Sequence, residues 1–226
     1  MAWTEGDLRE LTAILRDAYG EDTQVWPEDP VDVLILTLLS QATSDQNRDR
    51  AFRRLKERFP TWAQVEAAPL EEVIEAIALG GLAQQKAPRI KAILQRLREE
   101  WGTYTIDHVA SLDEEEAFAY LESLPGIGPK TAACVLLFAF DRPAFPVDTH
   151  VRRVGERLGL FPRGTDAIKA QRYLQQVVPP EIMHPLHVLL IAHGRRYCRA
   201  RRPLCTDCFL LPRCVWGNRQ GGDEPS

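Results

Sequence analysis

Apolar residues recur three and four positions apart along most of the chain, which is the spacing of one face of an α-helix. A mostly apolar stretch from Val31 to Leu39, interrupted by Asp32, predicts a helix that is buried on nearly all sides. Alternating apolar and polar positions, the signal of a strand, are nearly absent. The predicted helices of the first half cover residues 8–15, 31–40, 71–78 and 86–100. A basic amphipathic helix follows the second of them. It carries Phe52, Leu55 and Phe59 on one face and has basic residues elsewhere, namely Arg48, Arg50, Arg54 and Lys56. The sequence therefore predicts an all-α protein.

The central segment from Tyr120 to Cys134 predicts two helices joined by a tight turn. An acidic helix that starts at Glu114 is stopped by Pro125-Gly126, and a second helix begins near Pro129, a favourable first helical residue. The glycines leave backbone N–H groups accessible at a helix N-terminus, where a phosphate can bind without a side chain. A bare Pro-Gly is common in ordinary turns. The full string Leu-Pro-Gly-Ile-Gly-Pro-Lys-Thr-Ala favours a helix–hairpin–helix, at about residues 114–139.

Lys130 and Asp148 are candidate catalytic residues that follow this turn. Lys130 opens the second hairpin helix, where the helix dipole disfavours a cation and favours the neutral, nucleophilic amine. A solvated lysine is the alternative. Asp148 lies in Pro-Val-Asp-Thr-His and is suited to cap a helix that starts at Thr149. A cap also holds a carboxylate rigidly, so capping and catalysis are compatible.

Four of the five cysteines lie close together, as Cys198-x6-Cys205-x2-Cys208-x5-Cys214. Disulfides are rare in the cytosol, so a metal site is the favoured interpretation. Four thiolates suit either zinc or an iron–sulfur cluster, and the spacing alone does not decide between them. Cys134, inside the second hairpin helix, is expected in the core.

Basic residues interleave with this cysteine segment. Residues 151–226 carry 13 Lys and Arg against 6 Asp and Glu, whereas residues 1–150 carry 15 against 26. The overall charge of −4 argues against a nucleic-acid partner, but the asymmetry suggests that one region faces a polyanion. A loop pinned by a metal would present Arg199, Arg201 and Arg202 to phosphates. An uneven solvated surface is the alternative.

Composition and hydropathy indicate an ordinary globular protein. Hydrophobic residues make up 45% and charged residues 27% of the chain. The longest apolar stretch is too short to span a bilayer, and no apolar signal region follows Met1. We therefore expect a cytoplasmic protein with no membrane partner.

The motif Leu-Pro-Gly-Ile-Gly-Pro-Lys130 followed by Val-Asp148-Thr-His resembles the endonuclease III branch of the helix–hairpin–helix DNA glycosylase superfamily. The resemblance extends from the first helix to Cys214. In that family the lysine aligned with Lys130 attacks the sugar C1′, and the aspartate aligned with Asp148 assists. The cysteine spacing is similar to that of the family's 4Fe–4S loop, which implies an iron–sulfur cluster as the cofactor.

The resemblance implies two lobes, a helical barrel domain of residues 23–140 and an iron–sulfur domain of residues 1–22 and 141–226. It also implies a monomer that acts on double-stranded DNA containing damaged bases or AP sites. Removal of oxidised pyrimidines, such as thymine glycol, would be followed by β-elimination through a Lys130 Schiff base. One alternative is a mismatch-specific or adenine-type monofunctional glycosylase, although an enzyme that uses water has no need of Lys130. The other is a non-catalytic DNA-binding or redox-sensing iron–sulfur protein.

Two loops are expected to fill the gap that an extruded nucleotide leaves in the duplex. Leu82, in Gly-Gly-Leu-Ala-Gln-Gln-Lys, matches the apolar filler of the family. The glutamine filler lies in Ser-Ala-Gln-Ala-Thr-Asp in many bacterial members, whereas this chain reads Ser-Gln-Ala-Thr-Ser-Asp. Ungapped alignment places Ala42 at its position, so either Gln41 or Ala42 fills the gap. The other implied DNA contacts are Gly126, Gly128, Thr131, His150, Arg153, Arg199, Arg201 and Arg202.

Overall fold

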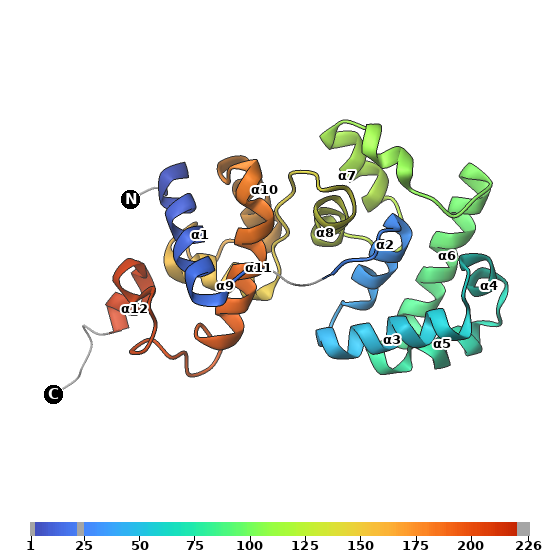
Figure 1. The fold of residues 1–226 in the computed structure, drawn as a ribbon, viewed down its shortest axis with the longest axis horizontal. Coiled ribbons are helices and arrows are strands. Elements are labelled where there is room, and N and C mark those ends of the chain that lie inside the picture. The colour runs from blue at the N-terminus through green and yellow to red at the C-terminus, as the bar shows by residue number, and fades with distance from the viewer. Residues whose placement is uncertain (1–2, 22–24, 221–226) are drawn as a thin grey trace. The chain divides into compact units, whose positions relative to one another are not determined.

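The computed structural model describes residues 3–21 and 25–220, which form helices joined by turns and contain no strand (Figure 1). The all-α prediction is therefore confirmed. The chain divides into two compact units, residues 25–142 and residues 1–24 with 143–226. We call them the hairpin unit and the cysteine unit. The predicted domain boundary between residues 22 and 23 lies outside the described residues.

The hairpin unit is built around α2, which is apolar on nearly all sides. All of residues 31–39 except Asp32 are buried, and α3, α6 and α8 pack against this helix. Burial on nearly all sides is what the mostly apolar sequence of residues 31–39 predicts. The elements of this unit are α2 (Pro30–Leu39), α3 (Asp45–Arg58), α4 (Trp62–Ala67), α5 (Leu70–Ile77), η1 (Ala78–Gly80), α6 (Ala83–Trp101), η2 (Asp107–Ser111), α7 (Glu114–Glu122) and α8 (Pro129–Phe140).

Side-chain caps fix the ends of the helices on either side of residues 40–44. At the end of α2, the Ser40 hydroxyl donates to the Thr37 carbonyl at 2.6 Å and the Ser40 N–H donates to the Leu36 carbonyl at 3.0 Å. The Ser44 hydroxyl accepts from the N–H of Asn47 at 3.3 Å and starts α3. The short turn that carries Gln41 and Ala42 is therefore defined at both ends.

Arg48 on α3 differs from the prediction, which placed it on the polar face of the helix. The residue is 6% exposed. Its guanidinium carbon lies 5.7 Å from the ring centroid of Trp26, and its Nη2 lies 2.7 Å from the Asp49 carboxylate. The ring and the carboxylate offset the cost of removing the charge from water.

The cysteine unit is organised by α11, against which α1 and α9 both pack (Figure 1). Leu8, Leu11 and Leu15 form the buried face of α1, as their spacing predicts. Gly194 allows α9 to approach α11 closely, since a Cβ there would lie 3.0 Å from the His150 Cβ. The elements of this unit are α1 (Glu5–Tyr19), α9 (Thr149–Leu158), α10 (Ala167–Val177), α11 (Pro180–Arg196), η3 (Leu211–Arg213) and α12 (Val215–Gln220).

The turn between α7 and α8 requires glycine at position 126. Gly126 has a φ of +80°, and a Cβ there would lie 2.5 Å from the Arg89 Cδ. Gly128 has a φ of −109°, and a Cβ there would meet nothing within 4 Å. Ile127, between them, is 6% exposed and fills the space under the turn. Folding therefore constrains Gly126 much more strongly than Gly128.

We predict that Gly126→Ala lowers the free energy of unfolding by about 1–3 kcal/mol, because an L-residue is strained in the left-handed region. Displacement of the Arg89 side chain adds to this loss. Gly128→Ala should change stability by less than about 0.5 kcal/mol, since poorer capping is offset by a less flexible unfolded chain. Urea denaturation of both variants measures the difference, and equal losses would contradict this account of the turn.

Candidate functional site

Lys130 is the second residue of α8, directly after Pro129, and is half-buried. Proline is favoured at a first helical position because its φ is already helical. The N-cap residue is Gly128, which has no side chain, so no cap hydrogen bond from a side chain forms there. The amine therefore emerges from the first turn of a helix at the hairpin, where the sequence placed it.

Gln41 contacts the hairpin turn from the α2–α3 connection. Its Nε2 donates to the Gly126 carbonyl at 3.1 Å and lies 3.4 Å from the Thr131 hydroxyl. Thr131 is 5% exposed, so its side chain lies beneath Gln41. Ala42 is exposed, has a φ of +52° and offers only a methyl group. The two candidate gap fillers of this loop thus differ sharply in reach.

Leu82 precedes α6 and is 47% exposed. Its φ of +51° lies in the left-handed region, which is unfavourable for a branched apolar residue. The loop therefore holds a large apolar side chain in solvent at a conformational cost. Such strain is concentrated at functional sites in proteins.

Asp148 caps α9, as its position in the sequence predicts. Its Oδ1 accepts from the Val151 N–H at 2.7 Å. The preceding backbone is also fixed, because the buried His187 places its Nδ1 2.9 Å from the Pro146 carbonyl. The positive end of the α9 dipole stabilises the carboxylate. The Asp148 side chain is therefore held in one orientation.

Arg153 connects α9 to the first cysteine of the loop. Its Nε donates to the Cys198 carbonyl at 2.8 Å, and its Nη2 donates to the Gly194 carbonyl at 2.9 Å. The same Nη2 lies 3.0 Å from His150 Nδ1, and burial lowers the pKa of His150. These contacts give Arg153 a role in holding the loop, in addition to the DNA contact expected from the sequence.

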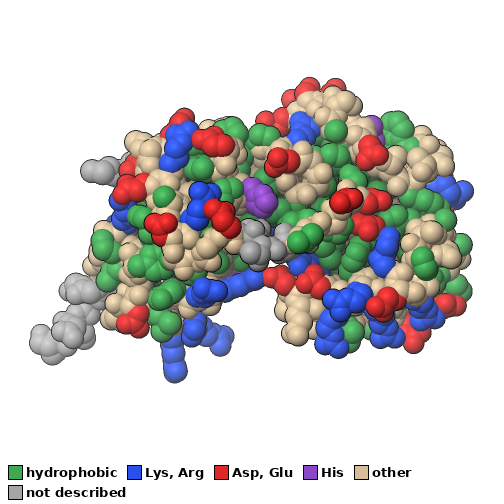
Figure 2. Space-filling model, viewed as in Figure 1, with side chains coloured by type: hydrophobic (Ala, Val, Ile, Leu, Met, Phe, Trp, Pro, Cys, Tyr) green, Lys and Arg blue, Asp and Glu red, His purple; other side chains and the backbone are tan. Residues whose placement is uncertain are grey.

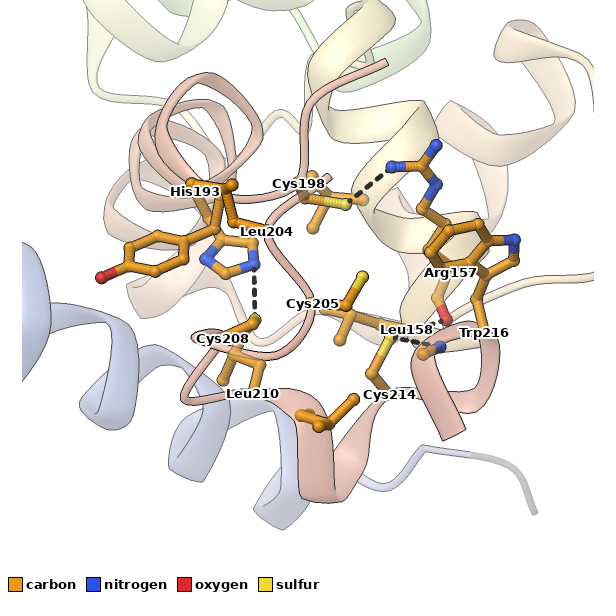
Figure 3. Close-up of a pocket in the computed structure, with 14 residues that line it drawn as sticks. Arg157, Leu158, His193, Cys198, Leu204, Cys205, Cys208, Leu210, Cys214 and Trp216 are labelled. Carbon is orange, nitrogen blue, oxygen red and sulfur yellow. Dashed lines mark hydrogen bonds between the residues drawn. The ribbon is translucent and has the colours of Figure 1, made fainter. Parts of the chain in front are cut away.

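The four cysteines of the C-terminal segment line one cavity with mostly apolar walls (Figure 3). None of these four cysteines forms a disulfide with another described residue, and Cys134 is buried in α8 as expected. In the described part of the chain, no three His, Cys, Asp or Glu side chains are placed to hold a single metal ion. The residues that contribute to the walls include Val154, Leu158, Tyr197, Leu204, Leu210, Leu211 and Trp216.

Nitrogen donors face three of these sulfurs (Figure 3). The Cys198 Sγ accepts from Arg157 Nη1 at 3.3 Å, and the Cys214 Sγ accepts from the Gly217 N–H at 3.3 Å. His193 Nε2 lies 3.6 Å from the Cys208 Sγ. Hydrogen bonds of this kind orient metal-bound thiolates and tune them.

The proton on His193 can be placed from its second contact. Its Nδ1 lies 2.8 Å from the Tyr19 hydroxyl. Burial lowers the pKa of His193 to about 4 and raises the pKa of Tyr19, so both groups are neutral near pH 7. In the tautomer in which this hydroxyl donates to Nδ1, the imidazole proton is on Nε2 and faces Cys208.

Burial also raises the pKa of the Cys205 and Cys208 thiols. Stable thiolates at these positions therefore need additional positive charge, which a metal ion or an iron–sulfur cluster provides. The four sulfurs, their N–H donors and the apolar walls together fit such a group.

Arg157 is a residue of this site that the sequence analysis missed. Its guanidinium lies 4.5 Å from the Trp216 ring centroid and donates to the Arg199 carbonyl at 2.8 Å. The spacing from Arg153 gives a signal that could have found it, because residues four apart on α9 share one face. Arg199, Arg201 and Arg202 are exposed, and Figure 2 shows Lys and Arg side chains projecting from this unit. Residues 199–202, which we call the basic loop, are thus held at their start by Arg157.

Comparison with known proteins identifies the same family that the hairpin motif resembles. Residues 35–180 match the family described as "HhH-GPD superfamily base excision DNA repair protein". Endonuclease III of Thermotoga maritima is 37% identical over 196 residues, which cover 87% of each chain. Endonuclease III of Escherichia coli K12 is 33% identical and covers 92% of this chain and 94% of its own. A putative DNA glycosylase of Arabidopsis thaliana is 39% identical, but the alignment spans 80% of this chain and only 59% of the plant protein.

Solved structures give the same result. A non-covalent endonuclease III–DNA complex matches with a TM-score of 0.84 at 28% identity and covers 98% of this chain and 100% of its own. A trapped endonuclease III–DNA covalent intermediate matches with a TM-score of 0.83 at 30% identity, covering 97% and 99%. The chain therefore belongs to the HhH-GPD superfamily of base excision DNA repair proteins. Within this superfamily it is a DNA glycosylase of the endonuclease III type. None of its described helices is long and apolar enough to cross a membrane.

The free energy of unfolding of Asp148 variants separates its N-cap role from any catalytic role. We predict that Asp148→Asn changes the free energy of unfolding by less than about 0.5 kcal/mol, because asparagine caps helices as well as aspartate does. Asp148→Ala should cost about 1 kcal/mol through loss of the bond to Val151. Thermal unfolding of both variants tests this, and a large loss in Asp148→Asn would show that the charge itself supports folding.

Proposed function

We propose that the protein removes oxidised pyrimidines, such as thymine glycol, from double-stranded DNA and then cleaves the AP site by β-elimination. The observation that carries this proposal is the half-buried Lys130 in the first turn of α8, at a hairpin that matches the endonuclease III type. A glycosylase that uses water as its nucleophile has no need of an amine there. Asp148, held at the N-terminus of α9, supplies the second group.

The chemistry follows from these two side chains. The neutral Lys130 amine attacks the sugar C1′ as the N-glycosidic bond breaks, and the base departs with the bonding electrons. The Asp148 carboxylate stabilises the oxocarbenium character of the sugar and accepts the amine proton. The amine nitrogen then expels O4′ from C1′, a proton goes to O4′, and the ring-opened Schiff base acidifies the C2′ proton. Loss of that proton expels the 3′ phosphate, and hydrolysis of the Schiff base frees the lysine.

Backbone amides and arginines account for binding to DNA phosphates. The open side of Gly128, where a Cβ would meet nothing, lets a phosphate approach the N-terminus of α8. Arg199, Arg201 and Arg202 lie on the loop that Arg157 holds, and they add sequence-independent attraction. The similarity to endonuclease III–DNA complexes supports a duplex as the partner.

Extrusion of the damaged nucleotide needs side chains that fill the vacated space. Leu82 is exposed and apolar, as one filler should be. We assign the second to Gln41, because its side chain is long enough to replace a base and already reaches the Gly126 carbonyl. The methyl group of Ala42 is too short for this role.

We further propose that Cys198, Cys205, Cys208 and Cys214 hold a 4Fe–4S cluster. The four thiols line one cavity, three of them receive N–H donors, and their spacing resembles that of the endonuclease III loop. When bound, the cluster would cross-link residues 198–214 and could exchange one electron. Arg157 and Arg153 hold the adjoining backbone of the basic loop.

Borohydride trapping on a thymine-glycol duplex tests the reaction. We predict that the wild type forms a covalent adduct and that Lys130→Gln forms none. Asp148→Asn should slow base release by about 10²- to 10⁴-fold while duplex affinity changes little. A duplex with undamaged thymine serves as the substrate control.

Three outcomes would contradict parts of this account. Base release by the wild type without an adduct indicates a monofunctional glycosylase, and an adduct in Lys130→Gln indicates another nucleophile. Equal losses of rate and affinity in Asp148→Asn would remove its catalytic assignment.

Iron analysis of the purified protein tests the cluster. We predict about four iron atoms per chain and broad absorption near ~400 nm from sulfur-to-iron charge transfer. Cys208→Ser should lose most of the iron. Cys134→Ser, a change in a buried cysteine outside the loop, should keep it. Stoichiometric zinc without iron would refute the cluster.

A further inference from the structure

Lys86 is a buried lysine for which the proposed chemistry gives no role. The residue is 1% exposed, and its Nζ donates to the Leu39 carbonyl at 2.7 Å and to the Gly80 carbonyl at 2.8 Å. Its backbone N–H donates to the Leu82 carbonyl at 2.9 Å. All three acceptors are backbone oxygens. Lys86 therefore organises main chain from segments that are distant in the sequence.

The segments joined in this way are the two loops that carry the proposed gap fillers. Leu39 is the last residue of α2 and lies two residues before Gln41. Gly80 is the last residue of η1 and lies two residues before Leu82. The loops also approach each other without Lys86, since a Cβ on Gly81 would lie 3.9 Å from the Ala42 carbonyl oxygen. The Lys86 ammonium thus binds one carbonyl at the start of each loop and holds the two loops together.

Both loops contain backbone that is unfavourable for their residues. Four non-glycine residues in the described ranges have positive φ, and two of them are Ala42 at +52° and Leu82 at +51°. Such conformations persist only where surrounding contacts fix them. The bond from the Lys86 ammonium to the Gly80 carbonyl supplies a contact of this kind two residues before the strained Leu82.

We propose that Lys86 is a positioning residue for nucleotide extrusion, which clamps the Gln41 loop and the Leu82 loop into one preassembled wedge. The inference rests on the proposed function, because only an enzyme that extrudes a nucleotide needs both fillers in place at once. Preassembly avoids the cost of ordering two loops at the moment the base leaves the stack. A compact ammonium with three donors suits carbonyls that arrive from different directions.

Lys91 provides a matched control on the same helix. Its Nζ donates to the carbonyls of Val65, Glu66 and Ala68, at the end of α4. Lys86→Met and Lys91→Met therefore both remove an ammonium–carbonyl clamp that starts from α6. Only the first removes a clamp that holds the filler loops.

The test compares single-turnover base release from two thymine-glycol duplexes. In one the lesion is fully paired, and in the other it lies in a short unpaired bubble, where extrusion is easier. We expect Lys86→Met to be slower on the paired lesion by about 10- to 100-fold, as for loss of a buried charged donor. On the bubble the loss should fall below about threefold. Lys91→Met should lose the same factor on both duplexes.

A double-mutant cycle shows whether Lys86 acts through the wedge. In a Leu82→Ala background, Lys86→Met should slow the paired duplex much less than it does in the wild type, because the filler is already absent. If Lys86→Met does not fold, Lys86→Gln, which keeps one donor, takes its place in both comparisons.

The outcomes distinguish this inference from the proposed function. A wild type that releases no base from either duplex refutes both. If the wild type releases base, the inference is overturned when the Lys86 variant loses the same factor on both duplexes, or when it matches Lys91→Met. A purely structural role for Lys86 gives that uniform loss.

Discussion

Gly126 sits in a left-handed conformation between two side chains from other parts of the hairpin unit. The stem of Arg89 covers the position where a Cβ would be, and the amide of Gln41 donates to its carbonyl. The turn at this residue determines where α8 begins. Because Lys130 is in the first turn of α8, the position of the proposed nucleophile depends on a backbone conformation that only glycine adopts easily.

In the cysteine unit, α9 is the helix that positions the proposed functional groups. Its N-terminus is capped by Asp148, and its later turns carry the half-buried Arg153 and Arg157, which donate to the carbonyls of Cys198 and Arg199. One helix therefore fixes the proposed catalytic carboxylate and the start of the basic loop. Arg153 also donates to the Gly194 carbonyl on α11. Its side chain therefore connects α9 both to α11 and to the start of the basic loop.

Much of this arrangement could be predicted from the sequence because its signals are local. The apolar run of α2, the Pro-Gly stop before α8 and the N-cap at Asp148 are each written within a few neighbouring residues. The role of Lys86 could not be found in this way, because its ammonium binds backbone carbonyls, and any residue supplies a carbonyl. For Arg157 the spacing from Arg153 indicates the helix face, but its carbonyl partner at Arg199 lies 42 residues away and leaves no local signal. The burial of Arg48 was missed for a related reason, since its aromatic partner Trp26 comes from outside α3.

The account depends most on Lys130 as the nucleophile, and the site of covalent attachment tests this directly. Borohydride reduction of the enzyme on a thymine-glycol duplex, followed by nuclease and trypsin digestion and mass spectrometry, locates the sugar remnant on one residue. The account predicts a modified peptide that spans residues 99–152, with no cleavage after Lys130, because trypsin cuts neither at an alkylated lysine nor at the Arg142-Pro143 bond. Attachment to any other lysine or to the N-terminal amine would contradict it.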